Sequence, residues 1–115
     1  MRAIDLTWNG GEHSFLLTID LLKALQERCD AGPRWILARL LENQWRVEDV
    51  VETIRLGLEG GGLDKEQARK LVKWNVEERP LTESVLPAAL ILNYALFGVD
   101  EDQALGEARA AAETR

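Results

Sequence analysis

Apolar and polar residues alternate near the start of the chain with the period of a β-strand. Apolar side chains occupy every second position of residues 4–8, and the same period continues through residues 13–17. Asn9 and Gly10 stand between the two runs, and this pair readily adopts the positive φ angles of a tight hairpin turn. Residues 2–17 therefore predict a two-stranded antiparallel hairpin, whose apolar face needs helices to cover it because a lone ribbon is only marginally stable.

From residue 19 to residue 97 the apolar positions recur every three or four residues, as in amphipathic α-helices. The runs break at residues that typically begin or end helices, which gives about five helices. The expected N-caps are Thr18, Asp64 and Ser84. Gly60 is expected to end its helix in the left-handed conformation, and Gly98 is expected to end the last helix. The last run, VLPAALILNYALF, is apolar nearly all round and is expected at the centre of the bundle.

The third predicted helix has the clearest two-sided pattern. Its expected buried stripe consists of Val47, Val50, Val51, Ile54 and Leu58. Its expected solvent-facing side consists of Glu48, Asp49, Glu52 and Arg55. This pattern is typical of a helix that covers a core on one side only.

These elements predict an α+β fold, mostly α, in which an N-terminal two-stranded β-hairpin packs on a bundle of about five helices. Residues 1–98 are predicted to form a single globular domain. Residues 99–115 carry five acids against two arginines and end in an alanine-rich stretch. They are predicted to form an acidic C-terminal tail, either flexible or loosely helical.

A run of three glycines, Gly60 to Gly62, raises the question of a phosphate-binding loop. Such a loop normally leads from a strand into a helix, and its glycines follow G-x-x-x-x-G-K-[ST] or G-x-G-x-x-G. Here a helix precedes the run, neither pattern occurs, and Asp64 holds the position where an anion would bind. The run is therefore interpreted as a link between two helices.

The overall composition narrows the choice of partners. The chain has 115 residues and a net charge of −6, so repulsion disfavours nucleic acid and anionic membranes as partners. The most apolar run has 13 residues, whereas a membrane-spanning helix needs about 20. The first ten residues lack the apolar core of a signal peptide, and a single cysteine cannot form an intrachain disulfide. We therefore expect a cytoplasmic protein.

Candidate catalytic residues are sparse. His13 is the only histidine, so a histidine-based metal site or catalytic triad would lack partners, and it is expected to be an exposed strand residue. Cys29 follows Leu25 at helical spacing without an evident activating base, which favours a core position. Most paired acids are adjacent in sequence and would point apart on a helix. We expect no enzyme activity, no cofactor and no metal.

Tryptophan residues supply the first candidates for partner binding. Trp8 lies on the apolar face of the hairpin and is expected in the core. Trp35, Trp45 and Trp74 lie outside the clear apolar stripes, and tryptophan is enriched where proteins bind each other. Trp45 and Trp74 are the favoured exposed contact residues. The alternative is that each tryptophan packs between neighbouring elements of the bundle.

Basic residues supply the second group of candidates. Lys65, Arg69 and Lys73 recur every four residues and would line one side of the fourth helix. Three interpretations remain open: a solvated face, a contact with an acidic partner or a second copy of the chain, and a helix-turn-helix-like contact with DNA.

Three segments together carry a family resemblance. In order along the chain they read FLLTIDLLKALQE, WRVEDVVETIRLGLEGGGLDKEQARKLV and RPLTESVLPAALILNYALFGVDE. This arrangement resembles the small gene-transfer-agent and phage tail family over about residues 4–101. The most specific part is RLGLEGGGLDKEQA combined with ALFGVDE.

The resemblance implies a non-enzymatic role in building a phage-like tail, and it transfers no catalytic residue. Members of the family are described as tail tube or tail assembly chaperone proteins. A chaperone would bind the tape-measure protein, the tail tube subunits or both. The alternative is a structural tube subunit, which we expect to contain more β-structure than this chain predicts. A DNA-binding regulator that uses the basic residues of the fourth helix is the lesser alternative.

Overall fold

The computed structural model describes residues 2–98, so the predicted tail, residues 99–115, lies outside the described part of the chain. The elements are β1 (Ile4–Trp8), β2 (Gly11–Phe15), α1 (Ile19–Cys29), α2 (Pro33–Leu41), α3 (Val47–Gly60), α4 (Lys65–Val72), the π-helical turn η1 (Lys73–Glu77), the 3-10 turn η2 (Leu81–Ser84) and α5 (Val85–Phe97). The predicted fold class, an N-terminal hairpin with five α-helices, is confirmed.

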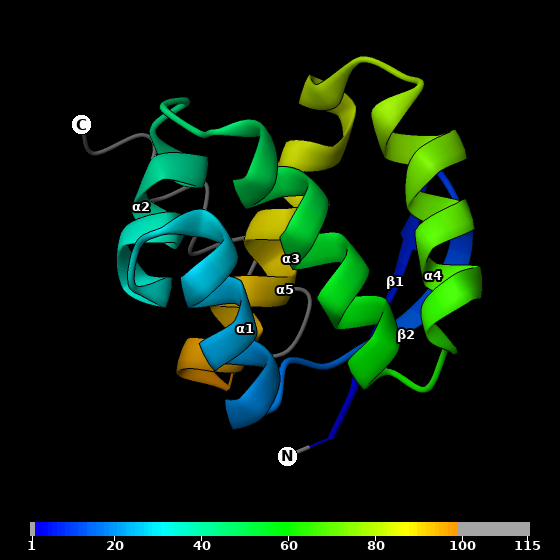
Figure 1. The fold of residues 1–115 in the computed structure, drawn as a ribbon, viewed down its shortest axis with the longest axis horizontal. Helices are drawn as coiled ribbons and strands as arrows, with labels where there is room; N and C mark the ends of the chain where they lie inside the picture. The colour runs from blue at the N-terminus through cyan, green and yellow to red at the C-terminus, as the bar shows by residue number, and fades with distance from the viewer. Residues whose placement is uncertain (1, 99–115) are drawn as a thin grey trace.

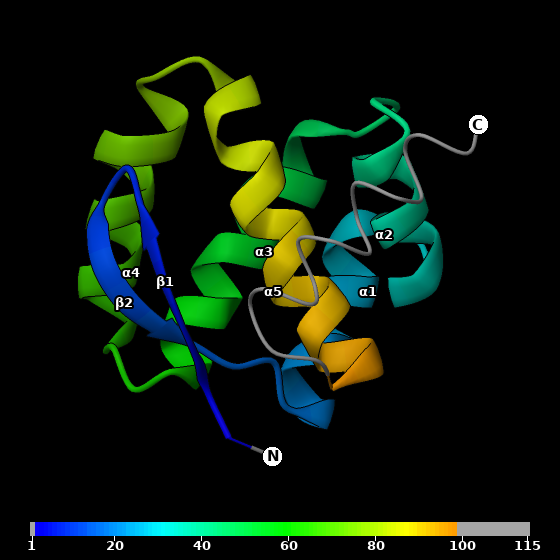
Figure 2. The same ribbon diagram turned by 180° about the vertical axis from the view of Figure 1, so that it is seen from behind.

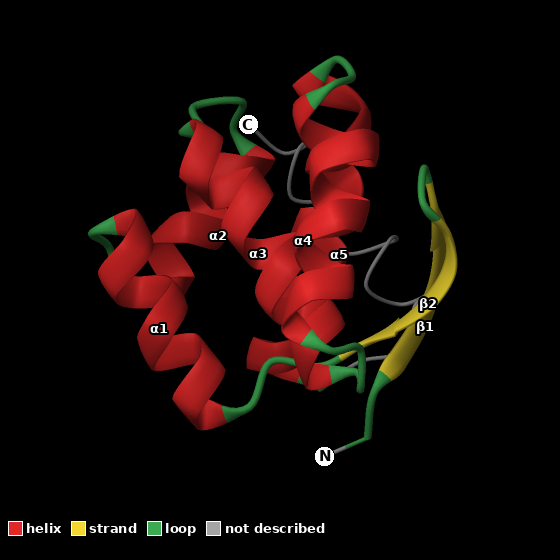
Figure 3. Cartoon of the chain, turned by 45° about the vertical axis from the view of Figure 1, so that its right-hand side comes forward, coloured by secondary structure: helices red, strands yellow, loops and turns green. Residues whose placement is uncertain are grey.

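The helix α5 lies at the centre of the described chain (Figure 1). It packs on α2, α3 and β1, and six consecutive residues, 88–93, are buried. The helices α1 and α2 lie on one side of α3 and α5, while α4 and the hairpin lie on the other side (Figures 1 and 2). Figure 3 shows the hairpin as a thin outer layer beside α4 and α5.

The hairpin pairs β1 with β2 antiparallel, from Ile4 opposite Phe15 to Trp8 opposite Gly11. Trp8 is buried, as predicted, and its indole edge packs against Phe15. Asn9 and Gly10 do form the turn, but the positive φ belongs to Gly11 (φ 105) rather than to either of them. The prediction was wrong on this point. A turn followed by a left-handed glycine also preserves the strand twist.

The tip of the hairpin is tied to the second half of the chain. The Asn9 side chain donates to the Asn75 carbonyl oxygen at 3.3 Å and to Glu83 Oε1 at 3.0 Å. Arg79 Nε donates to the same carboxylate oxygen at 2.8 Å. The Arg79 guanidinium and the Asn9 amide hold the pKa of the Glu83 carboxyl below its ordinary value, because both stabilise its charged form.

Local capping explains several of the helix ends. Thr18 Oγ1 accepts from the Leu21 amide at 3.3 Å, and Asp64 Oδ1 accepts from the Glu66 amide at 2.8 Å, so both predicted N-caps are confirmed. Gly98 ends α5, also as predicted, and has φ 70. Ser84 differs, because its side chain makes no capping hydrogen bond and is buried. The 3-10 turn η2 leads directly into α5 instead.

The glycine run joins α3 to α4 through close contact with β2. Gly60 is the last residue of α3, and the left-handed conformation falls on Gly62 (φ 115), so the predicted left-handed Gly60 was wrong. A Cβ atom on Gly60 would overlap the Leu16 carbonyl oxygen, and one on Gly61 would overlap the Ser14 carbonyl oxygen. These two glycines therefore let the end of α3 lie directly on the hairpin's backbone.

Val47 and Asp49 depart most from the predicted pattern of α3, and the side chains of Glu52 and Arg55, also expected to face solvent, are only 16% and 15% exposed. Val47, expected in the buried stripe, is 52% exposed, whereas Asp49, expected to face solvent, is fully buried. Arg39 of α2 meets Asp49 with two hydrogen bonds, Nη2 to Oδ1 at 2.6 Å and Nε to Oδ2 at 2.9 Å. The Arg46 amide also donates to Asp49 Oδ2 at 2.9 Å. The carboxylate thus caps α3 from inside the fold.

Candidate partner-binding surface

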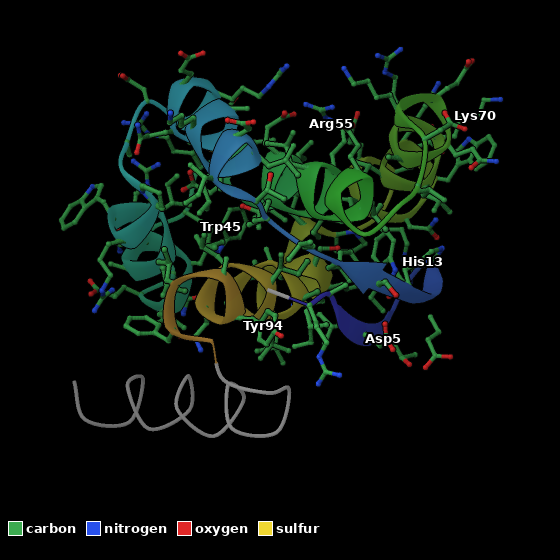
Figure 4. All side chains as sticks on the ribbon, turned by 90° about the horizontal axis from the view of Figure 1, so that it is seen from below. Asp5, His13, Trp45, Arg55, Lys70 and Tyr94 are labelled. Carbon is green, nitrogen blue, oxygen red and sulfur yellow. The ribbon has the colours of Figure 1, made fainter. Side chains whose placement is uncertain are left out.

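The helix α4 and the turn η1 form one continuous segment at the edge of the molecule. Asp64 caps its start, and the segment buries Ala68, Val72 and Val76 against the core. The remaining sides of the segment face solvent. Figure 4 shows Lys70 on this outer side, pointing away from α3.

The structure brings four of the six predicted contact residues onto this segment. Lys65 and Arg69 lie on α4, and Lys73 and Trp74 begin η1. All four are exposed, and the Trp74 side chain is 57% exposed, as expected.

The other two tryptophans lie elsewhere. Trp35 of α2 is 64% exposed. Its neighbour in the sequence, Arg34, places its guanidinium over the Phe97 ring. Trp45 is half-buried and packs against the core just before α3 (Figure 4), so the prediction that it is exposed was wrong. The connection after α2 folds back over the core, and the indole covers its edge.

An apolar groove runs beside Trp74. It has a volume of about 300 Å³ and is lined by Leu63, Gln67, Lys70, Leu71 and Trp74, which we call the basic groove. The residues of α4 in it follow helical spacing, so they share one face of the segment. Of the residues that line the groove, Trp74 was predicted from the sequence as a contact residue, whereas Leu63, Gln67, Lys70 and Leu71 were not. Their spacing from Trp74 was visible in the sequence, but the path of the chain between α3 and α4 was not.

The cations of the α4–η1 segment have no ion-pair partner in the described part of the chain. The ion pairs among residues 2–98 involve Arg28, Arg39, Arg55 and Arg79. In that same part of the chain, none of the four cations of this segment, Lys65, Arg69, Lys70 and Lys73, forms an ion pair. A basic surface with an apolar groove therefore stands on a chain whose net charge is −6.

A second, larger hollow lies between the hairpin and the glycine run. It has a volume of about 490 Å³, and Asp5, Glu12 and His13 line it together with Gly61 and Gly62. The two carboxylates would repel a phosphate, which supports the interpretation of the glycines as a structural link. His13 is half-buried rather than exposed as expected, because its Nδ1 accepts from Trp8 Nε1 at 2.9 Å.

Cys29 lies in the core, as predicted. Burial, reinforced by the nearby Asp49 carboxylate, raises the pKa of its thiol to about 12. Both effects disfavour the thiolate, which is the nucleophilic form. Within residues 2–98, no group of three or more potential metal-ligating side chains gathers at one place, and no helix is long and apolar enough to cross a membrane.

The described chain is thus a small α+β domain that presents an exposed tryptophan, an apolar groove and unpaired cations on one edge. Exposed apolar patches with a tryptophan are common where proteins bind each other. The family model described as phage tail tube protein, GTA-gp10, matches residues 2–98, and the chain belongs to this family. The resemblance predicted from the three sequence segments is confirmed. Neither a curated protein nor a solved structure matches the chain.

Proposed function

We propose that this protein is a non-enzymatic tail assembly chaperone, which acts in the cytoplasm and binds another tail protein through the α4–η1 segment. The observation that carries this proposal is the basic groove, where Trp74 and Lys70 stand beside an apolar floor of Leu63 and Leu71. Lys65, Arg69 and Lys73 lie on the same α4–η1 segment, outside the lining of the groove. A surface of this kind suits the apolar face of a helix that also carries acidic residues. The tape-measure protein and the tail tube subunits are the candidate clients.

The shape of the groove supports a helical client. Its lining runs from Leu63, two residues before α4, to Trp74, and eleven residue steps at the rise of an α-helix span about 16 Å. A client helix of about three turns could lie along this length, with its apolar residues on Leu71 and Trp74 and its acids near Lys70. The acidic remainder of the chain would keep such a complex soluble.

Co-expression with a tape-measure protein, followed by size-exclusion chromatography with light scattering, tests the proposal. We expect a soluble complex, although the tape-measure protein expressed alone is insoluble. Trp74→Ala should weaken the complex at least about tenfold, because exposed tryptophans in grooves commonly dominate binding. Trp35→Ala is the matched control, since Trp35 is equally exposed but lies on α2. Loss of binding with Trp35→Ala alone would show that the contact surface lies on α2.

A structural subunit of the tail tube is the second candidate, and the description of the family favours it. A subunit of this kind should form rings or tubes without a client. We rank the chaperone first because we expect the wall of a tail tube to be built from β-sheet, and the described chain has only two short strands. Electron microscopy of the purified protein at high concentration separates the two, because only a tube subunit should form regular rings.

A further inference from the structure

A second apolar groove lies where the start of α3 meets the turns η1 and η2. It has a volume of about 370 Å³ and is lined by Val47, Glu48, Val51, Glu52, Glu77 and Leu81, which we call the acidic groove. None of these residues lines the basic groove. The acidic groove is therefore a separate surface, which the proposed client contact does not use.

The floor of the acidic groove is aliphatic and open to solvent. Val47 and Val51 are four residues apart on α3, so they share one face of that helix. Leu81 of η2 completes the floor. Val47 is 52% exposed, although its place in the apolar stripe of α3 predicts burial. The described chain, residues 2–98, thus leaves half of this side chain uncovered.

Carboxylates flank this floor on both sides. Glu48 on α3 and Glu77 on η1 are exposed, and neither forms an ion pair with another residue of the described chain. Glu52 differs, because it pairs with Arg55 and, at 3.4 Å, with Arg28. The rim therefore carries two unpaired negative charges, one on each wall of the groove.

The arginines nearest to these two acids in the sequence are engaged elsewhere. Arg46 directs Nη1 to the Cys29 carbonyl oxygen at 3.5 Å, away from the lining of the groove. Arg79 Nε donates to Glu83 at 2.8 Å. The negative charge of the rim is thus left for a partner to neutralise.

The π-helical turn η1 separates the two grooves. Trp74 and Glu77 are three residues apart, and residues at this spacing would be neighbours on one face of an α-helix. The wider winding of η1 instead places Trp74 in the basic groove and Glu77 in the acidic groove. Short π-helical segments are rare and are frequently found at functional sites. Here the segment gives each groove its own charged or aromatic side chain.

We propose that the acidic groove binds a basic amphipathic helix of another protein, whose aliphatic stripe is flanked by lysine or arginine. The aliphatic stripe covers Val47, Val51 and Leu81, while the flanking cations pair with Glu48 and Glu77. An uncharged apolar partner would bury both carboxylates unpaired, which is costly, and an acidic partner would be repelled. This partner is opposite in charge to the client proposed for the basic groove, so the inference goes beyond the proposed function and does not depend on it.

Fluorescence anisotropy of labelled synthetic peptides, titrated with the full chain, tests the proposal. The probe is a peptide of about four helical turns with a leucine stripe flanked by lysines, and the matched probe carries glutamate in place of every lysine. We expect the lysine peptide to bind and the glutamate peptide to bind at least about tenfold more weakly. Added salt should weaken the lysine peptide's binding, because it screens the rim charges.

Variants of the protein show where the lysine peptide binds. Glu48→Lys and Glu77→Lys should each lower its affinity about fivefold or more, because each places a like charge against the peptide. Val47→Ser should lower it about threefold or more through loss of apolar contact, although the net charge is unchanged. Glu12→Lys is the control with the same change in charge, since Glu12 is exposed and lies in the hollow at the other end of α3. Circular dichroism checks that each variant is folded.

Four results would overturn the proposal. One is that the lysine peptide does not bind, and another is that Glu12→Lys weakens binding as much as Glu48→Lys, which would indicate a general attraction to an acidic protein. A third is binding that is lost with Trp74→Ala but retained with Glu48→Lys, which would place the peptide in the basic groove. The fourth is self-association of the protein alone that Val47→Ser abolishes, since a second copy would then occupy the groove.

The proposed function is measured separately. Glu48→Lys leaves the lining of the basic groove intact, so a client complex with this variant would preserve the proposed function even where the lysine peptide failed to bind. Trp74→Ala gives the converse, because it alters the basic groove and leaves the acidic one unchanged.

Discussion

At the scale of single residues, the glycine run meets two different requirements within three positions. Gly60 and Gly61 leave room for the carbonyl oxygens of Leu16 and Ser14, while Gly62 supplies the positive φ. Local sequence predicts that a glycine ends the helix, but it does not show which of three consecutive glycines does so. That choice depends on β2, which precedes the run by more than forty residues.

The close contact at Gly60 predicts a large effect from a small side chain. We expect Gly60→Ser to lower the free energy of unfolding by at least about 2 kcal/mol, because the hairpin backbone must move to admit the Cβ atom. Gly32→Ser is the matched control. Gly32 stands at the N-cap of α2 with open space around it, so serine should be neutral or slightly stabilising there. Urea denaturation of both variants measures the difference, and equal stabilities would contradict this account.

The raised pKa of the Cys29 thiol gives a second prediction. The folded protein holds the proton more tightly than the unfolded chain, so this residue favours folding below about pH 9 and loses that contribution as the pH rises toward about 12. We expect the thiol to react with a disulfide reagent at pH 8 only as fast as the protein unfolds. Urea should accelerate the reaction in parallel with unfolding. Rapid labelling of the folded protein would show that the thiol is accessible.

At the scale of elements, the sequence predicts those helix ends that are determined by hydrogen bonds between neighbouring residues. Thr18 and Asp64 cap their helices through neighbouring amides, so their roles could be read from the chain. Asp49 could not be placed in this way. Its helical position predicts exposure, but Arg39 on α2 and the Cys29 carbonyl, which accepts from Arg39 Nη2 at 3.3 Å, form a buried network around it. Only the packing of α1, α2 and α3 reveals this network.

Removing the charge of Asp49 should destabilise the junction of these helices. We expect Asp49→Asn to lower the free energy of unfolding by about 3 kcal/mol, because it leaves the buried Arg39 guanidinium without its counter-charge. Glu48→Gln is the control, as the neighbouring acid is exposed and forms no ion pair among residues 2–98. That change should stay within about 0.5 kcal/mol. Thermal and urea denaturation provide the measurement, and similar losses for both variants would contradict the buried pair.

At the scale of the whole molecule, Trp45 and Trp74, the two tryptophans favoured as exposed contact residues, have different roles. We expect Trp45→Ala to lower the free energy of unfolding by about 2 kcal/mol, since half of the indole packs on the core. Trp74→Ala should change it by less than about 0.5 kcal/mol. Denaturation curves of the two variants, measured side by side, test this assignment. A loss of stability with Trp74→Ala would place that indole in the core.

The shape of the basic groove also depends on the whole molecule. Lys65, Arg69 and Lys73 could be predicted as one stripe from their spacing on a single helix. The groove itself needed Leu63 from the connection before α4 and the rotation of α4 against the core. The absence of internal partners for the cations likewise depends on where every acid of the described chain lies. Sequence therefore indicated the helix that carries the surface, but not the shape of the surface.

The tie between the hairpin tip and the second half of the chain has a consequence for synthesis on the ribosome. Asn9 leaves the exit tunnel 66 residues before its partner Asn75 and 74 residues before its partner Glu83. The helix that covers β1, α5, follows later still. The hairpin therefore stays without its core until almost the whole domain has been made. Because such distant contacts close slowly, we expect a nascent chain truncated before α5 to leave the β1 amides open to hydrogen exchange.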